Sequence, residues 1–311
     1  MGTMGQERTT SHAMEWLKNA RDKIVALAEG EKGKRSSETP RVGVALAGGF
    51  ARGIAHIGVL QVLQEEGIPV HCVAGTSVGA LIGVGYCAGV PLAEMEALGV
   101  ATCFSDFGRW VPSWLGLATN QRMEKYLTRL TTAKTFEELK TPMAISATDI
   151  NAGVTVYYSS GPIAPALRAS CAYPGLFVPI QYEGRTLVDG FLTSPVPVEG
   201  AMLLGADVVI AVYLETTGVD NPRTAVDVIS RSFNIIQRHA DITWRQQADV
   251  IIEPDVQKIG WEDFCKTPEM VAAGREATKK ALPEIRAAIQ AERRDSAESS
   301  SQPSATSTDR G

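Results

Sequence analysis

The sequence predicts an α/β domain in which helices cover both faces of a central, mostly parallel sheet. Two segments, residues 42–47 and 206–213, are rich in β-branched and small apolar residues, as strands buried on both faces of a sheet are. Strand-like and helix-like segments also follow one another along the chain, which is the pattern of parallel α/β folds. A glycine-rich turn, residues 48–53, directly follows the first of these strands.

The first unit of this fold spans residues 41–79. After the first strand and its glycine turn, a helix is predicted over residues 54–66, because the apolar residues there recur at helical spacing. A second strand, residues 70–74, follows and ends in the sequence GTSVG at residues 75–79. Two glycine turns therefore lie at the same ends of two parallel strands, where open α/β sheets bind ligands.

The remaining elements follow from apolar spacing and from Gly and Pro breaks. Helices are predicted over residues 80–88, 122–130, 136–139, 163–171, 198–204, 222–247 and 268–294. Strands are predicted over residues 142–149, 154–158, 182–188, 206–213 and 248–252. Residues 150–153 (INAG) are expected to form a hairpin turn between two of these strands. The segment 222–247 is expected to be one long amphipathic helix.

One segment is unusually rich in aromatic residues. Residues 104–117 (FSDFGRWVPSWLGL) contain Phe104, Phe107, Trp110 and Trp114, and their Gly and Pro residues interrupt any helix. Such a segment could form an apolar, mobile rim that faces lipid. It could also be a loop that packs on the core of the sheet, which is the more common arrangement and the one we favour from sequence.

The chain divides into three parts. Residues 1–40 are an appendage, with an amphipathic helix over 11–28 and a polar linker; residues 41–294 form one folded domain; residues 295–311 are rich in Ser and Thr and predict a disordered tail. The N-terminal helix could lie on a membrane surface. Docking on the domain or on a partner is the more common explanation.

Composition excludes several classes of function. The 311-residue chain has a formal net charge of −5, which gives no electrostatic basis for binding nucleic acid. Its five cysteines are scattered and include no C-x-x-C pair, so neither a metal site nor a disulfide framework is expected, in keeping with a reducing, cytoplasmic location. No secretory signal and no apolar run of about 20 residues is present, so only peripheral membrane contact stays open.

The turn at residues 48–53 (GGFARG) allows two interpretations. A strand, a glycine turn and a helix also begin a dinucleotide site, whose fingerprint is G-x-G-x-x-G. Phe50 stands where the second glycine would be, however, and no ribose-binding carboxylate ends the following strand. A glycine turn can instead direct backbone N–H groups at a developing oxyanion. That role suits a serine on the neighbouring strand.

Ser77 is the candidate nucleophile. It is the serine of a G-x-S-x-G sequence that begins at Gly75 and ends at Gly79, with a strand before it and a helix after it. The two glycines give the room that a tight strand-to-helix turn requires, and the helix N-terminus adds a positive dipole near the serine. A plain glycine-rich connection is the alternative, and the context makes the nucleophile the better explanation.

A serine nucleophile requires a base. The chain contains four histidines, His12, His56, His71 and His239. Only His239 follows Ser77 and Asp189 in the chain order of an α/β-hydrolase triad, but it lies inside a predicted helix rather than on a loop. A carboxylate base is the alternative. Asp189 ends a predicted strand and precedes Gly190, which lets the backbone come close to the serine.

Together these residues resemble the patatin-like phospholipase family in its compact bacterial branch. The oxyanion turn of that family, G-G-G-x-[RK]-G, is matched by residues 48–53, its G-x-S-x-G by residues 75–79, and its D-G-[GA] in part by residues 189–191. Residues 168–175 (RASCAYPG) also resemble a small-residue helix end near the active site of the family. The likeness covers roughly residues 41–283.

The resemblance implies a three-layer α/β/α fold and a serine hydrolase of lipid esters without a metal or organic cofactor. Ser77 would be the nucleophile, Asp189 its base, and an acyl-serine the intermediate. The implied oxyanion hole consists of Gly48, Gly49 and Phe50, and the implied supporting residues are Arg52, Gly53, Gly75, Gly79 and Gly190.

Two residues depart from the family pattern. Phe50 replaces a glycine and cannot adopt a positive φ cheaply, and Phe191 replaces a small residue and could narrow the pocket. Two alternatives to lipid hydrolysis therefore stay open. One is an acyltransferase or thioesterase that uses the same acyl-serine, and the other is a regulatory or binding protein that has lost turnover on this fold.

Overall fold

The computed structural model describes residues 39–215, 221–222, 224–240 and 243–301. Its centre is an eight-stranded sheet with the order β11-β10-β1-β2-β5-β9-β8, and β6 pairs with β5 outside that path. The first five of these strands are parallel to one another, and β6, β8 and β9 are antiparallel to their neighbours. The strands are β1 (Val42–Leu46), β2 (Cys72–Thr76), β5 (Met143–Asp149), β6 (Val154–Tyr158), β8 (Ile180–Tyr182), β9 (Arg185–Asp189), β10 (Val208–Val212) and β11 (Val250–Ile252).

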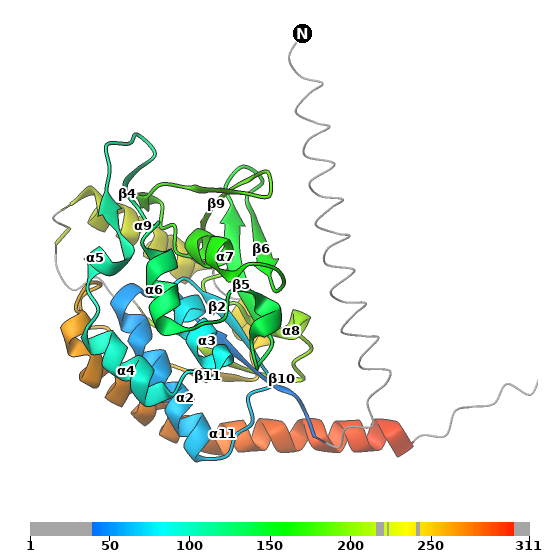
Figure 1. Ribbon diagram of the computed structural model, residues 1–311. Helices are drawn as coiled ribbons and strands as arrows, with labels where there is room; N and C mark the ends of the chain where they lie inside the picture. The colour runs from blue at the N-terminus through cyan, green and yellow to red at the C-terminus, as the bar shows by residue number, and fades with distance from the viewer. Residues whose placement is uncertain (1–38, 216–220, 223, 241–242, 302–311) are drawn as a thin grey trace, which may run out of the picture.

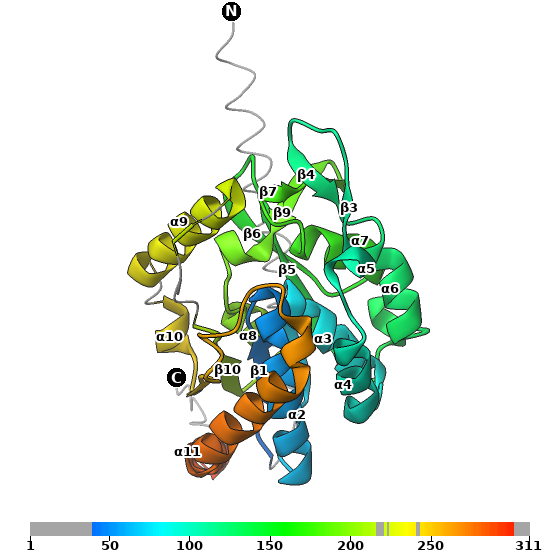
Figure 2. The ribbon, with the colours of Figure 1, turned by 90° about the vertical axis from the view of Figure 1, so that its left-hand side faces the viewer.

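Helices cover both faces of this sheet, which confirms the predicted three-layer arrangement (Figures 1 and 2). The longer helices are α2 (Ala55–Glu65), α3 (Val78–Ala88), α4 (Leu92–Val100), α6 (Met123–Leu130), α7 (Ile163–Ser170), α8 (Val198–Leu203), α9 (Ala225–Ala240), α10 (Thr243–Gln247) and α11 (Thr267–Ser301). Successive side chains of β2 point to opposite layers: Val73 faces Gly83 of α3, and Ala74 faces Gly200 of α8. The strands β1, β2 and β10 are buried along their whole length, because both faces are covered.

A smaller sheet lies beside the carboxyl ends of the central strands. It consists of β3 (Arg109–Trp110), β4 (Gly116–Thr119) and β7 (Gly175–Phe177), and the short helix α5 (Phe104–Phe107) precedes it. Its buried apolar residues form a second cluster together with Ala172 and Tyr173, and Phe50, Phe191 and Phe233 pack on this cluster. The two bulky residues that depart from the expected motifs are thus part of an aromatic cluster beside the main core.

The short 3-10 helices are η1 (Phe50–Ile54), η2 (Phe136–Glu138), η3 (Gly190–Leu192) and η4 (Phe264–Lys266). The predicted strand 182–188 is instead the β8–β9 hairpin, because Glu183 and Gly184 both adopt a positive φ and form its two-residue turn. In place of one helix over 222–247 the structure describes α9 and α10. The helix α11 continues to Ser301, so the first residues of the predicted tail are helical.

The predicted N-terminal helix at 11–28 and residues 302–311 lie outside the described part of the chain. Among the described helices, not one combines the length and the apolar character that crossing a bilayer requires.

Candidate active site

The two glycine turns predicted from sequence touch one another. The strands β1 and β2 are adjacent and parallel, with Leu46 opposite Gly75, so the turns that follow them leave the same edge of the sheet. A Cβ atom added at Gly48 would lie only 3.4 Å from the Cβ of Ser77. The glycine turn is therefore packed directly against the serine.

Ser77 occupies a strained backbone position between β2 and α3. Its φ of 54° and ψ of −121° lie outside the regions that residues with a side chain readily adopt. Gly79 is required behind it, since a Cβ there would lie 2.2 Å from the carbonyl oxygen of Leu46. The N–H of Ser77 donates to the buried Ser170 Oγ at 2.8 Å, which helps to hold the turn. This geometry presents the Ser77 hydroxyl at the edge of the sheet.

Asp189 is delivered to the serine by the antiparallel pairing of β9 with β5, in which Asp189 lies opposite Ala147. The next residue must be small, because a Cβ at Gly190 would lie 2.3 Å from Ser146 Oγ. The Ser77 hydroxyl donates to Asp189 Oδ2 at 2.8 Å, and the N–H of Phe191 donates to Oδ1 at 2.9 Å. Both carboxylate oxygens of Asp189 are thus oriented by hydrogen bonds.

The Asp189 carboxyl is 1% exposed, and its burial raises its pKa from 3.8 to about 7. The hydrogen bonds from the Phe191 N–H and the Ser77 hydroxyl favour the carboxylate and hold the pKa lower than burial alone would. A carboxylate with a pKa of about 7 is a much stronger base than an ordinary aspartate. An aspartate with an ordinary pKa of 3.8 would be a weak base for a serine hydroxyl, and the burial of Asp189 makes it a stronger one.

The histidines with described side chains make contacts away from Ser77. His56, in α2, is fully buried, its ring N–H donates to the carbonyl of Ala47 at 2.9 Å, and burial lowers its pKa to about 4. His71 accepts from the N–H of Val42 at the opposite ends of the strands. The side chain of His239, in α9, lies outside the described residues, as does His12. Asp189 is the described partner of the serine.

The glycine turn leaves two N–H groups for an oxyanion. The N–H of Gly48 donates to the carbonyl of Pro195 at 3.2 Å, and that of Ala51 donates to the carbonyl of Trp261 at 3.1 Å. The N–H groups of Gly49 and Phe50, which lie between Gly48 and Ala51 in the chain, have no acceptor among the described residues. Gly48 therefore cannot serve as predicted without losing its own hydrogen bond, and the candidate oxyanion hole narrows to Gly49 and Phe50.

Phe50 adopts the positive φ that its side chain disfavours, at 53°. Its ring packs against Tyr173, with centroids 5.0 Å apart, and against Trp261, at 5.3 Å. These long-range contacts hold a conformation that glycine would adopt without cost. The departure from the family pattern thus keeps the bend of the turn and adds an aromatic side chain beside the serine.

Arg52 and Gly53 support the turn rather than the reaction. Arg52 Nε donates to the carbonyl of Ile259 at 2.7 Å, which ties the loop that carries Trp261 to the turn. A Cβ at Gly53 would lie 2.2 Å from Val78, so this glycine allows η1 to pack closely on α3. Their contacts are within the turn and its neighbours, and their supporting role stays a prediction.

Two cavities open on Ser77 from different sides. An apolar cavity is lined by Phe50, Ile54, Ile57, Ser77, Val78, Leu81, Ile82, Met95, Leu98, Gly99, Thr102, Phe104, Phe107, Met123, Tyr126, Leu130, Cys171, Phe177, Trp261 and Phe264. A polar cavity is lined by Gly48, Gly49, Phe50, Arg52, Ser77, Tyr173, Asp189, Phe191, Asn221, Pro222, Thr224, Asp227, Ser230, Arg231, Asn234, Lys258, Ile259, Gly260, Trp261, Glu262 and Asp263. Ser77, Phe50 and Trp261 belong to both. The serine therefore lies where an apolar and a polar compartment meet.

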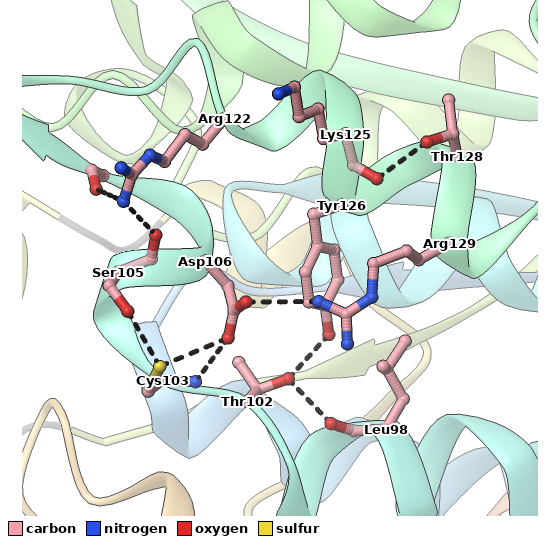
Figure 3. A network of polar contacts seen from close by, with 11 residues as sticks. Leu98, Thr102, Cys103, Ser105, Asp106, Arg122, Lys125, Tyr126, Thr128 and Arg129 are labelled. Atoms are coloured by element: carbon pink, nitrogen blue, oxygen red, sulfur yellow. Dashed lines mark hydrogen bonds and ion pairs between the residues drawn. The ribbon is translucent and has the colours of Figure 1, made fainter.

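The few hydroxyl groups on the wall of the apolar cavity are paired (Figure 3). Thr102 Oγ1 donates to the carbonyl of Leu98 at 2.7 Å, so it accepts the hydroxyl of Tyr126 at 2.9 Å. The Tyr126 ring packs on Phe107, with centroids 4.6 Å apart. With these groups satisfied by one another, the cavity offers mainly apolar surface to a ligand.

Sequence reasoning did not identify Ser170 or Trp261 as parts of the site. Ser170 lies in the small-residue stretch 168–175, but its bond to the Ser77 N–H joins positions that are 93 residues apart. Trp261 reaches the turn through a loop without a motif. Only the three-dimensional contacts indicate either role.

Residues 44–202, about half of the chain, match the family model described as patatin-like phospholipase. An uncharacterised NTE family protein of Mycobacterium tuberculosis is 36% identical over 194 residues, which are 61% of this chain and 54% of that protein. The lysophospholipase nte1 of Emericella nidulans is 32% identical over 207 residues, 63% of this chain and 13% of that protein.

The chain thus spans about half the length of the mycobacterial relative and a small part of the fungal one. Among solved structures, VipD from Legionella pneumophila superimposes with a TM-score of 0.48 at 14% identity, over 81% of this chain and 67% of that chain.

Proposed function

Because the chain belongs to the patatin-like phospholipase family, we propose that it is a serine hydrolase that cleaves lipid acyl esters. Ser77 is the nucleophile and Asp189 the base in this proposal. The observation that carries it is the 2.8 Å hydrogen bond from the Ser77 hydroxyl to a carboxyl whose burial raises its pKa to about 7. A serine on a strained turn with such a partner is suited to nucleophilic attack.

The proposed reaction has two halves. In the first, Asp189 Oδ2 accepts the proton of Ser77 as Oγ bonds to the ester carbonyl carbon, and the N–H groups of Gly49 and Phe50 stabilise the oxyanion. The ester C–O bond then breaks, and the leaving alcohol takes the proton from Asp189. In the second half Asp189 accepts a proton from water, whose oxygen attacks the acyl-serine. The acid leaves, and the proton returns to Ser77.

The two cavities support an amphiphilic substrate. An acyl chain placed in the apolar cavity brings its carbonyl carbon to Ser77, where the cavities meet. The alcohol part of the ester then extends into the polar cavity, whose lining includes Arg52, Arg231 and Lys258. A lipid ester has this division into an apolar and a polar half, whereas a small soluble ester fills neither cavity. Lysophospholipids are the first substrates to test, because relatives carry that name.

The test is labelling of the intact protein by a fluorophosphonate probe, which reacts with activated serines. We expect wild type to be labelled and to release free fatty acid from a lysophospholipid, while Ser77→Ala is neither labelled nor active. Ser105→Ala removes an exposed serine hydroxyl elsewhere and serves as the matched control. Labelling in a Ser77→Ala variant would contradict the assignment. A wild-type protein without labelling would favour the binding-protein alternative, and transfer of the acyl group to a lipid acceptor would favour the acyltransferase.

A further inference from the structure

The β3–β4 hairpin presents an exposed apolar surface at its tip. The exposed fraction of Trp114 is 104%, which means that this residue is as accessible as in an extended chain. The exposed fractions of the other apolar residues are 69% for Leu115, 64% for Trp110 and 47% for Leu117. The segment 110–118 (WVPSWLGLA) contains no charged residue. The expectation that the aromatic segment packs on the core therefore holds only for its first part, since Phe104 and Phe107 are half-buried. Exposed apolar patches of this kind mark surfaces that contact a protein or a membrane.

The exposed surface of the hairpin continues into the apolar cavity of the candidate active site. The ring of Trp110 packs on Phe104, with centroids 5.6 Å apart. Phe104 in turn contacts Phe177, at 5.9 Å, and Trp261, at 6.3 Å. Phe104, Phe177 and Trp261 all line the cavity that contains Ser77. Aromatic rings in contact with one another therefore lead from the hairpin into the cavity that contains the candidate nucleophile.

The base of the hairpin is fixed to the domain on both of its sides. The strand β4 pairs with β7, and a Cβ at Gly116 would lie 2.6 Å from the backbone of Phe177, so the two strands lie in close contact. On the other side Arg122 donates to the carbonyls of Ser105 and Gly108, at 2.9 and 3.5 Å (Figure 3). The tip projects away from the sheets in both ribbon views (Figures 1 and 2). Its direction relative to the cavity is set by this base.

We propose that the tip of this hairpin inserts Trp114 and Leu115 into the surface of a lipid aggregate, next to the entrance of the apolar cavity. Tryptophan and leucine without neighbouring charges favour the boundary between acyl chains and water. Apart from Ser113 and the indole N–H groups, the tip offers no polar side chain that could specify a protein partner. The delivery of an acyl chain along Trp110 and Phe104 rests on the proposed function, whereas the insertion itself does not.

The test measures sedimentation of the full chain with phosphatidylcholine vesicles, using the Ser77→Ala background so that catalysis does not alter the lipid. We expect Trp114→Ser/Leu115→Ser to weaken vesicle binding by about tenfold or more, because two apolar side chains no longer enter the interface. Val100→Ser/Met202→Ser is the matched control. It removes two other exposed apolar side chains, from α4 and α8, which are 52% and 45% exposed, and should bind as the parent does.

A second readout separates this inference from the proposed function. In the wild-type background, the hairpin variant should retain hydrolysis of a soluble short-chain ester and labelling by a fluorophosphonate, while hydrolysis of vesicle lipid falls in parallel with binding. Equal vesicle binding by variant and parent overturns the inference. So does a change in oligomeric state without a change in vesicle binding, since the tip would then contact a second copy. Loss of soluble-ester hydrolysis in wild type would instead count against the proposed function.

Discussion

The two cavities at Ser77 are built from different kinds of structure. The apolar cavity is lined largely by side chains of η1, α2, α3, α4 and α6, which all lie between residues 50 and 130. The polar cavity is lined mainly by the turns that carry the three motifs, by residues of α9 up to Asn234 and by the loop at residues 258–263. Packed helices enclose most of the compartment that suits an acyl chain, whereas turns, a loop and the single helix α9 shape the one that suits a head group. We therefore expect the acyl preference of the protein to be harder to change than its head-group preference.

The largest expected effect comes from the proposed Ser77–Asp189 dyad, since Ser77 and Asp189 both line the polar cavity and Ser77 also lines the apolar one. Asp189→Asn should lower hydrolysis of every ester by about 10³-fold or more, because the asparagine amide cannot accept the Ser77 proton. The protein should stay folded, with an unchanged or raised Tm at pH 8. The folded pKa of Asp189, about 7, lies above the unfolded value of 3.8, so the stability that protonation gives is present below about pH 4 and is lost as the pH rises through 7. The asparagine side chain introduced by this substitution is uncharged both at pH 8 and below pH 4, so the variant does not lose this stability as the pH rises.

Activity and thermal unfolding of Asp189→Asn are both measured, with Asp207→Asn as the control variant. The carboxylate of Asp207 lies near β10 and accepts a hydrogen bond from the N–H of Arg41. Wild-type turnover by Asp189→Asn would end the dyad proposal and return His239 to consideration.

A second prediction concerns pH. Because only the ionised Asp189 accepts a proton, kcat/KM for a soluble ester should rise with pH and level off above about 7, where the carboxyl is ionised. The same rise of kcat/KM with pH should be seen with substrates that fill only the apolar cavity and with substrates that fill both cavities. A histidine base would titrate in the same range, so the profile is repeated with His239→Gln. We expect the pH dependence of kcat/KM to be unchanged in that variant. Loss of this pH dependence would assign the titration to His239.

The sequence predicted the unit from β1 to α3 closely, because each of its features is local. Strand composition, helical spacing and the two glycine turns all lie within residues 41–79, and the structure places them as expected. The pairing of Ser77 with Asp189 joins residues 112 apart through the β5–β9 register, and only elimination and family resemblance indicated it. The positive φ of Phe50 could not be predicted, since contacts with Tyr173 and Trp261 stabilise it. Local pattern thus indicated the candidate nucleophile, and long-range packing decided what surrounds it.

A third prediction tests the part of the apolar cavity that lies far from Ser77. The helix α3 runs from Ser77 past Gly85, about 12 Å at 1.5 Å per residue, and a Cβ at Gly85 would meet Met95 and Leu130. Met95→Trp should therefore shorten the cavity far from the serine. We expect kcat/KM for long-chain p-nitrophenyl esters to fall by about tenfold and that for the butyrate to stay unchanged. Met202→Trp on α8 is the control. Equal losses for short and long chains would show that Met95 affects folding rather than length.

The smallest expected effect concerns Phe50, whose ring lines both cavities. Phe50→Gly and Phe50→Ala both remove this ring, and both should reduce the discrimination between long-chain and short-chain esters severalfold. The two variants differ at the backbone, because Ala retains the cost of a φ of 53° and Gly does not. Gly should therefore unfold at a higher denaturant concentration than Ala, by about 1 kcal/mol in the free energy of unfolding.

Fluorophosphonate labelling should stay within about twofold of wild type in both Phe50 variants, since either residue still supplies the N–H proposed for the oxyanion. Equal stability of the two variants would mean that the backbone at position 50 is not strained. Slow labelling of both variants would mean that the ring holds this N–H in place. In that case the phenylalanine would be a positioning residue for the reaction, as well as the partition between the two cavities.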